Sequence, residues 1–459
     1  MTKSQEARSW EVTVSDCGPL RSALTRAVGD GRLVDDPAQL TAYAVDGVVP
    51  GFLAIPADVA GVRAVMQVAA SHGATVVPRG HGTKMRLGNP PRSADVLLCL
   101  QSLNRVVAYD VDNLTVIAQA GAVLEDLRKL VAGRHQMLPL DAPFPMDATV
   151  GGVVASNSSG PWRLGYGSAR DLILGMRVVM PSGDLIHTGG ATVKNVAGYD
   201  LDKLFIGSLG TLGAIVEVGF RLFPKPEATA TLQAAFLSAE QALVVTGQLL
   251  QSQYLPVAVE LLNPLALQLA GLGEKAFGLA IGLEGAPEAV QRQVEALTAL
   301  CQSGGAPAWQ VVTGQAEADL WSAVRGLPGL VAARSPAVAS TKSAVPLSGV
   351  AAVCRAATAA ASRRGLALVW DSRAGSGVVY AWFLGLAGDE PRQAAAIQEL
   401  REAATAAGGT TVLGAGLPAV KRAVPVWGGL PADLAAMKAI KSALDPLGIM
   451  SPGRYVGGI

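Results

Sequence analysis

Residues 194–213 read KNVAGYDLDKLFIGSLGTLG, a run in which small residues are mixed with apolar ones. Glycine, serine and threonine leave backbone N–H groups accessible, because no large side chain covers them. Apolar positions between them, such as Leu204 and Phe205, are typical of a buried setting. The run therefore predicts backbone donors arranged around a buried apolar surface.

Two earlier segments have the same character. Residues 78–84 read PRGHGTK after a predicted strand, and residues 148–160 read ATVGGVVASNSSG. Glycines let successive N–H groups converge on one anion, to which Arg79, Thr83 and Lys84 can add charge or a hydroxyl group. Taken singly, the first segment is weak evidence, because a short glycine turn after a strand is usually only a turn. The alternative for the second segment is a flexible surface loop, although its valines argue against exposure.

The order of these motifs resembles one flavoprotein family. RGxGT, ATVGGVVASNxxGP, YGSxRDLILG and KNVAGYDLxKLFxGSLGTLG follow one another as in the PCMH-type FAD-binding domain of vanillyl-alcohol oxidase-type, FAD-linked oxidases. Within that group the chain is most similar to FAD-binding subunits of glycolate oxidase complexes. The resemblance covers residues 40–226 well, the last 20 residues moderately and residues 229–410 loosely.

The resemblance implies a set of residues that contact FAD. The first loop would hold the pyrophosphate, the second would line the adenosine and ribityl side, and later segments would close over the cofactor. The C-terminal SPGR segment would approach the isoalloxazine. The implied contacts are Pro78, Arg79, Gly80, His81, Gly82, Thr83, Lys84, Thr149, Gly151, Gly152, Asn157, Gly160, Tyr166, Gly167, Asp171, Gly207, Leu209, Gly210, Thr211, Ile215, Ser451 and Arg454.

The first loop also bears on how FAD is attached. Some relatives tether the flavin through the histidine of an R-x-G-G-H pattern. Aligned on Arg79, that position is Thr83, and His81 lies two residues earlier. We therefore predict FAD that is bound non-covalently.

The C-terminal half departs from relatives that oxidise 2-hydroxy acids. Their H-x-G-D-G-N-x-H and E-H-G-I-G patterns can hold a divalent metal that polarises the substrate. Here the matching stretches read DSRAGSGVVY at 371–380 and VLGAG at 412–416, and all four histidines lie in the first 190 residues. The sequence therefore predicts no metal site in this half.

Two basic residues remain as candidate substrate contacts. The segment from Trp321 to Arg325 resembles a tryptophan–arginine element of the family, and Arg325 could bind a carboxylate with two hydrogen bonds. Lys342 could assist it. The alternative for Arg325 is a solvent-facing residue that caps the end of a helix.

The predicted fold class is α+β, with a two-subdomain PCMH-type FAD-binding domain and a ferredoxin-like α+β cap domain. The expected parts are an N-terminal extension at 1–45 packing on the FAD domain, the FAD domain at 46–228, the cap at 229–425, and a C-terminal segment at 426–459 that returns to the FAD domain. No sequence repeat of fixed period is visible. Expected helices and strands include helices at 57–72, 238–253, 286–301, 347–364 and 391–407, and strands at 258–262, 344–347, 366–371 and 378–386.

Composition narrows the function classes. The chain has 459 residues and a net charge of +1, which gives no electrostatic case for a nucleic-acid partner. Its four cysteines are scattered without a C-x-x-C motif, so we expect no iron–sulfur cluster and a reduced, cytoplasmic protein. No signal peptide is indicated, and the uncharged stretches at 374–388 and 403–420 are too short or too broken by glycine to span a membrane.

Three functions remain open from the sequence. The first is an accessory or electron-relaying FAD subunit of a complex that oxidises glycolate or D-lactate. Its partners would be a catalytic flavoprotein and an iron–sulfur subunit, and the complex could lie at the inner face of the membrane. The second is a self-sufficient FAD-linked 2-hydroxy-acid dehydrogenase that uses Arg325. The third is a flavoprotein scaffold without enzymatic activity.

Overall fold

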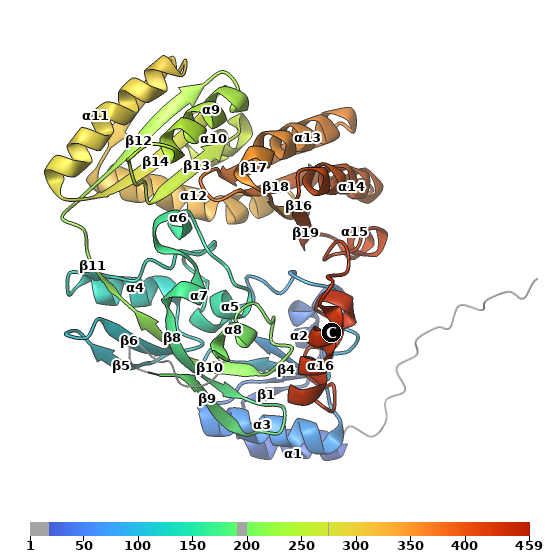
Figure 1. The fold of residues 1–459 in the computed structure, drawn as a ribbon. Coiled ribbons are helices and arrows are strands. Elements are labelled where there is room, and N and C mark those ends of the chain that lie inside the picture. Colours follow the sequence, from blue (N-terminus) through green and yellow to red (C-terminus); the bar gives the residue numbers. More distant parts are fainter. Residues whose placement is uncertain (1–17, 191–199, 274) are drawn as a thin grey trace, which may run out of the picture.

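The N-terminal half of the chain forms two subdomains, which make up the lower half of Figure 1. The structure is a computed structural model and describes residues 18–190, 200–273 and 275–459. The first subdomain contains a sheet of order β1-β2-β4-β3, in which β2, β4 and β3 are parallel. The bounds are β1 (Leu33–Val34), β2 (Phe52–Ala54), β3 (Val76–Arg79) and β4 (Val96–Cys99).

Helix α3 (Val59–His72) makes the crossover that parallel strands require. The Asp58 side chain accepts a hydrogen bond from the Gly61 N–H at its start, and Gly73, with φ +63°, ends it. Its buried face packs into the core of the subdomain. The helix predicted at 57–72 is confirmed.

The second subdomain is built on an antiparallel sheet of order β5-β6-β10-β8-β9. The bounds are β5 (Val106–Asp110), β6 (Thr115–Gln119), β8 (Ile173–Val179), β9 (Leu185–Gly189) and β10 (Ala214–Arg221). One continuous hydrophobic core joins the two subdomains. The other elements are α1 (Gly18–Val28), α2 (Pro37–Leu40), α4 (Leu124–Ala132), β7 (Gln136–Met137), α5 (Val150–Ala155), α6 (Arg163–Tyr166), α7 (Ala169–Leu172), α8 (Asp202–Phe205) and β11 (Phe223–Pro224). Helix α1 packs on α3 and buries Leu24 and Val28.

The cap is one eight-stranded antiparallel sheet of order β15-β12-β14-β13-β17-β18-β16-β19. Each half of it is a βαββαβ unit whose strands lie in the order fourth, first, third, second. The cap is thus two ferredoxin-like units, joined where β13 pairs with β17. The first contains β12 (Ala228–Phe236), α9 (Ala239–Leu250), β13 (Ala258–Leu262), β14 (Phe277–Gly285), α11 (Pro287–Ser303) and β15 (Ala308–Val312); the second contains β16 (Ala337–Ala344), α13 (Val350–Arg363), β17 (Ala367–Arg373), β18 (Val378–Gly385), α14 (Glu390–Ala406) and β19 (Thr410–Ala415).

Two helices lie on the sheet face that looks toward the two N-terminal subdomains. They are α10 (Pro264–Ala270) and α12 (Gly314–Arg334), which connects the two units (Figure 1). Helix α12 was not among the expected elements, although its buried residues follow helical spacing. Its internal Gly326 and Pro328, which are unfavourable in a helix, obscure that pattern.

The strand expected at 344–347 is wrong. Strand β16 ends at Ala344, and Pro346 has no N–H group with which to continue a ladder. The two uncharged stretches supply parts of β18, α14 and β19. Among the described residues, no helix is both long and apolar enough to cross a membrane.

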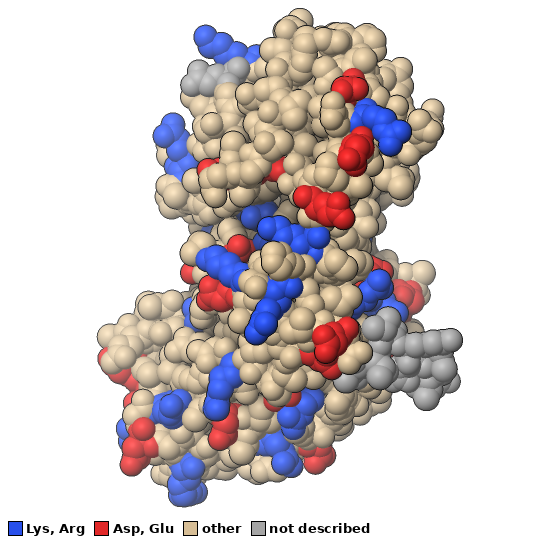
Figure 2. Space-filling model, turned by 90° about the vertical axis from the view of Figure 1, so that its left-hand side faces the viewer, with Lys and Arg blue, Asp and Glu red and all other residues tan. Residues whose placement is uncertain are grey.

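The C-terminal segment returns to the first sheet through α15 (Pro418–Ala423) and α16 (Leu434–Leu444). Val76 on β3 donates to the Ile449 carbonyl, and Ser451 donates back to the Val76 carbonyl, so the tail extends this sheet. The tail thereby lies beside the glycine loop that follows β3. Figure 2 shows basic and acidic side chains interspersed over one face, with basic ones gathered at the waist between the two lobes.

Candidate functional site

A slot lies between the two N-terminal subdomains. The glycine loop after β3, helix α5, the segment before β10 and the C-terminal tail all contribute to it. Most of the predicted FAD contacts line this slot: Pro78, Arg79, Gly80, Gly82, Thr83, Lys84, Thr149, Gly151, Gly152, Leu209, Gly210, Ile215 and Arg454. Met85, Leu100, Ala120, Ala155, Ser156 and Gly213 line it as well and were not predicted. The slot is thus built from segments that lie far apart in the sequence.

The first glycine loop offers unpaired donors. Within the described part of the chain, the amide N–H groups of residues 80–83 have no acceptor. Gly82 has φ +89°, which favours glycine, and a Cβ on Gly80 would lie 2.2 Å from the Thr149 Oγ1. The loop therefore keeps its N–H groups free in a space that has no room for a side chain, as a pyrophosphate site requires.

Gly151 has a similar constraint on the opposite wall. A Cβ there would lie 2.7 Å from the Ala120 Cβ, and the Gly151 N–H donates to the Ala120 carbonyl. Thr149 caps the start of α5 by accepting from the Gly152 N–H. These contacts hold α5 close to β6.

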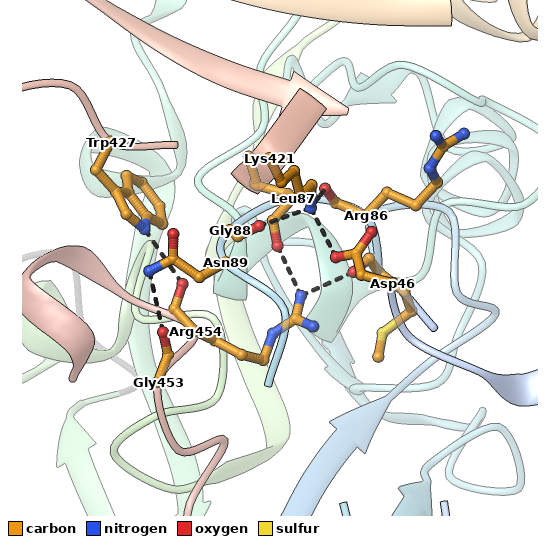
Figure 3. A network of polar contacts seen from close by, with 10 residues as sticks. Asp46, Arg86, Leu87, Gly88, Asn89, Lys421, Trp427, Gly453 and Arg454 are labelled. Atoms are coloured by element: carbon orange, nitrogen blue, oxygen red, sulfur yellow. Dashed lines mark hydrogen bonds and ion pairs between the residues drawn. The ribbon is translucent and has the colours of Figure 1, made fainter. Parts of the chain in front are cut away.

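Arg454 points into the slot from the tail. Its Nη2 donates to the carbonyls of Met85 and Leu87, whereas its buried Nη1 has no partner among the described residues (Figure 3). Burial lowers the pKa of this guanidinium to about 10. An unpaired buried donor of this kind is costly unless a ligand satisfies it.

Several predicted contacts lie outside the lining of the slot. His81 is exposed, and its carbonyl accepts a hydrogen bond from Arg79. Asn157 and Gly160 line the neighbouring cavity instead. Lys194 to Tyr199 lie outside the described residues.

The remaining predicted contacts have structural partners. The Tyr166 hydroxyl donates to the Glu284 carboxylate, and Gly167, with φ +82°, precedes a capping box that Ser168 and Asp171 form. The Gly207 N–H donates to the Val154 carbonyl, and the Thr211 hydroxyl donates to the Ser208 carbonyl. The Ser451 N–H donates to the Val76 carbonyl, while its buried Oγ has no partner among the described residues. None of these six residues lines the slot, so their predicted contact with FAD stays a prediction.

A second cavity opens beside the slot, with a volume of about 320 Å³. Thr83, Lys84 and Ser156 line both spaces, so the two are adjoining. This volume lies within the range of about 300–1,000 Å³ that is typical of small-molecule sites. The second cavity lies between the cap sheet and the FAD domain.

Basic side chains from four parts of the chain line this second cavity, and Arg86 lines it just after the glycine loop. Lys84 comes from the glycine loop, Arg325 from α12, Lys342 from β16 and Arg373 from β17. Burial, together with the charges of Arg373 and Lys342, lowers the pKa of Lys84 to about 8. A site in which neighbouring cations lower the pKa of a lysine favours an anionic ligand.

Arg373 was not predicted as a site residue. It is buried, its Nη1 donates to the Ser159 Oγ at 3.1 Å, and its guanidinium lies 4.6 Å from the centre of the Tyr380 ring. Its Nε lies 3.9 Å from a Glu260 oxygen and has no hydrogen-bond partner among the described residues. The sequence contained a signal that could have identified Arg373. Side chains alternate between the two faces of a strand, so Asp371 and Arg373 of β17 lie on the same face.

Two buried carboxylates accompany this arginine. Burial raises the pKa of Glu260 and of Asp371, and the charge of Arg373 opposes the rise in both. Both oxygens of Glu260 and the Oδ1 of Asp371 have no hydrogen-bond partner in the described part of the chain. Only Asp371 of the two lines the cavity.

Arg325 lies within α12, so the alternative of a helix-end cap is wrong. Its guanidinium lies 5.5 Å from the centre of the Trp162 ring, and its buried Nε has no partner among the described residues. Burial lowers its pKa. Arg325 and Lys342, the two predicted substrate contacts, thus both face the second cavity.

The comparison with protein families fits this geometry. Residues 50–189 match the model of the FAD binding domain, and residues 225–455 match the model of the C-terminal domain of FAD linked oxidases. The second match alone spans half of the chain. The chain belongs to the FAD-linked oxidases.

This FAD-linked oxidase has relatives along its whole length. It is 29% identical to "Glycolate oxidase subunit GlcD" of Bacillus subtilis, over 95% of this chain and 96% of that protein. It is 29% identical to a D-lactate dehydrogenase of Archaeoglobus fulgidus, over 87% and 90% respectively. A shorter match, 34% identical, covers 40% of this chain and 51% of "Glycolate oxidase subunit GlcE" of Escherichia coli.

A solved structure supports the predicted fold. p-Cresol methylhydroxylase superposes with a TM-score of 0.77 at 18% identity, over 95% of this chain and 96% of that chain. The PCMH-type α+β fold is therefore confirmed.

The FAD-linked oxidase is an FAD-dependent oxidoreductase, and its slot fits that cofactor. The free amides of residues 80–83 would face the pyrophosphate, and the unpaired Arg454 Nη1 would pair with an acceptor on the cofactor. FAD, when bound, supplies a two-electron acceptor next to the second cavity.

Proposed function

We propose that this FAD-linked oxidase oxidises a small 2-hydroxy acid, whose carboxylate is held by arginine and lysine side chains instead of a metal ion. The observation that carries the proposal is the buried Arg373, which lines a cavity next to the flavin slot together with Arg325, Lys342 and Lys84. The names of the relatives, glycolate oxidase and D-lactate dehydrogenase, point to the same substrate class.

Arg373 suits a carboxylate for geometric reasons. A guanidinium binds a carboxylate through two parallel N–H groups, and its planar shape orients the ligand. In this chain Arg373 occupies the stretch that carries metal-binding histidines in other relatives, and Lys342 lies two strands away on the same sheet. These side chains would bind and orient the substrate anion without a metal.

A second function is favoured by the relatives that are subunits of an oxidase. Two of them are named as subunits GlcD and GlcE, so we propose that the chain works within a multi-subunit complex. There it would pass electrons onward to an iron–sulfur partner, and the complex would be cytoplasmic or attached to the inner face of the membrane. Purification of the tagged chain from its own cells would test this, since a cysteine-rich partner should accompany it.

The oxidation itself is tested by the colour of the flavin. We expect glycolate, D-lactate or D-2-hydroxyglutarate to bleach the flavin absorbance of the purified holoprotein under anaerobic conditions. Arg373→Met should weaken binding of the substrate by 10-fold or more, because it removes a charged, bidentate partner. If none of the acids bleaches the flavin, the chain is an accessory subunit or a scaffold.

We also propose that FAD is bound non-covalently, because Thr83 stands where some relatives have the histidine that tethers the flavin.

A further inference from the structure

We propose that Asp371 is the catalytic base of this oxidase and takes the hydroxyl proton of the substrate on its Oδ1. This inference rests on the proposed function, because it requires a hydroxy acid in the second cavity. It concerns the chain's own chemistry in a place where other relatives carry histidines.

The position of Asp371 follows from the cap sheet. Side chains alternate along a strand, so Asp371 and Arg373 of β17 lie on the same face. Asp371 pairs with Tyr380 of β18, and Tyr380 also lines the cavity. The acceptor thus lies beside the arginine that would hold the substrate carboxylate.

Asp371 has the free oxygen that a base needs. Its side chain is buried, and its Oδ1 has no hydrogen-bond partner in the part of the chain that the structure describes. A buried acceptor without a partner costs free energy unless a ligand donates to it. A substrate hydroxyl in the cavity would be such a donor.

The other side chains that line the cavity are less suited to accept the hydroxyl proton of the substrate. Among the described residues that line it, Asp371 is the one carboxylate. Arg325 and Arg373 remain protonated, and the hydroxyl group of Tyr380 is a weak base. The cap contains no histidine. Lys84 is the remaining competitor, because burial lowers its pKa.

The electrostatic setting fits proton transfer near neutral pH. Burial raises the pKa of Asp371 to about 7, against the opposing charge of Arg373. Glu260, on the neighbouring strand β13, also has a raised pKa, and the charge of Asp371 contributes to that rise. The charges of Lys84 and Lys342 face the same space. A base works best when its pKa lies near the working pH.

The proposed step is balanced in atoms and electrons. The O–H bond of the substrate breaks and its proton passes to the Asp371 carboxylate. The C2–H bond would break with its electron pair, and FAD, when bound, would supply the two-electron acceptor for that pair and the hydrogen. A carbonyl forms at C2, so the products are a 2-oxo acid, reduced flavin and protonated Asp371.

Asp371→Asn tests this role in the holoprotein, with Asp319→Asn on the exposed surface of α12 as the matched control. We expect the rate of anaerobic flavin bleaching by the best substrate to fall about 10²–10⁴-fold in Asp371→Asn, as for the loss of a general base. The control variant should bleach at the parent rate. In Lys84→Met the bleaching rate should still rise as the pH increases through 7, because Asp371 still loses its proton. In Asp371→Asn this rise should be absent.

Binding of oxalate gives a readout that does not depend on turnover. Oxalate is an inert dianion above about pH 5, so its affinity should weaken as Asp371 ionises between pH 6 and pH 8. Lys84, with its pKa of about 8, stays largely protonated below pH 7. The pH dependence between pH 6 and pH 7 should therefore vanish in Asp371→Asn, while binding at pH 6 stays within about 3-fold of the parent. A thermal midpoint close to that of the parent would show that the variant is folded.

The outcomes separate this inference from the proposed function. If a 2-hydroxy acid bleaches the flavin of the parent, and Asp371→Asn bleaches at a rate within 3-fold of the parent rate, Asp371 is not the base and the proposed function stands. Loss of the pH dependence in Lys84→Met instead would assign the proton to Lys84. If the parent does not bleach with any 2-hydroxy acid, both proposals fail together.

Discussion

Replacing Lys421 by methionine removes an ammonium group that holds three parts of the chain together. The buried Lys421 Nζ donates to the Asp46 carboxylate at 2.6 Å and to the carbonyls of Arg86 and Gly88 at 2.6 and 2.7 Å (Figure 3). Lys421 lies on α15 of the C-terminal half, whereas its acceptors precede and follow the first glycine loop. The contact therefore fixes the segment that leaves the flavin cradle.

The loss in the free energy of unfolding that Lys421→Met should cause follows from these contacts. The side chains of Lys421 and Asp46 are 0% and 1% exposed, so solvent does not screen the pair. Removing one partner of a buried ion pair costs about 3–5 kcal/mol, since the other charge stays buried. At about 4 kcal/mol the unfolding equilibrium would shift by roughly 10³-fold. Adding Asp46→Asn removes the stranded charge and should leave about 2 kcal/mol, for the two carbonyls that lose their donor.

Urea titration of the holoprotein, followed by release of flavin fluorescence, measures this loss. Lys438→Met on the exposed side of α16 is the control and should change the stability by less than about 0.5 kcal/mol. A Lys421→Met protein within about 1 kcal/mol of the parent would refute the reasoning. So would a double variant less stable than Lys421→Met alone.

Three further predictions concern the slot and the cavity. Gly151→Ala should purify largely without FAD, because its Cβ would meet Ala120, whereas Gly247→Ala, with no atom within 4 Å, should keep a full flavin spectrum. Acid precipitation should leave the flavin in the supernatant, because Thr83 cannot form the histidyl tether; yellow pellets would contradict this. The raised pKa of Asp371 means that the folded state binds more protons than the unfolded state between about pH 4 and pH 7, so this group's stabilising contribution is lost as the pH rises through that window. The urea midpoint of Asp371→Asn should therefore rise relative to the parent from pH 5 to pH 8, and a constant difference would contradict the assigned shift.

The flavin cradle could be predicted from the sequence because its chemistry is local. A loop such as residues 78–84 needs only glycines at the end of a strand to present free N–H groups, and those residues are adjacent in the chain. The same holds for α3, whose capping residue, apolar spacing and terminal glycine all lie within 57–73. Tyr166 and Asp171 show the limit of motif reasoning, since they share a motif with the cradle, yet Tyr166 donates to Glu284 of the cap and Asp171 accepts from the Ser168 N–H at a helix start.

The cation-lined cavity was decided by the tertiary structure. Arg373 comes to Lys84 and Arg325 only because the cap sheet joins its two ferredoxin-like units at β13 and β17 and faces the FAD domain. That pairing depends on the burial of side chains from distant strands, which no local pattern specifies. The raised pKa of Asp371 likewise depends on its burial, which outweighs the opposing charge of Arg373. The sequence by itself determined a flavin-binding protein, whereas packing between distant segments decided which charges meet the substrate.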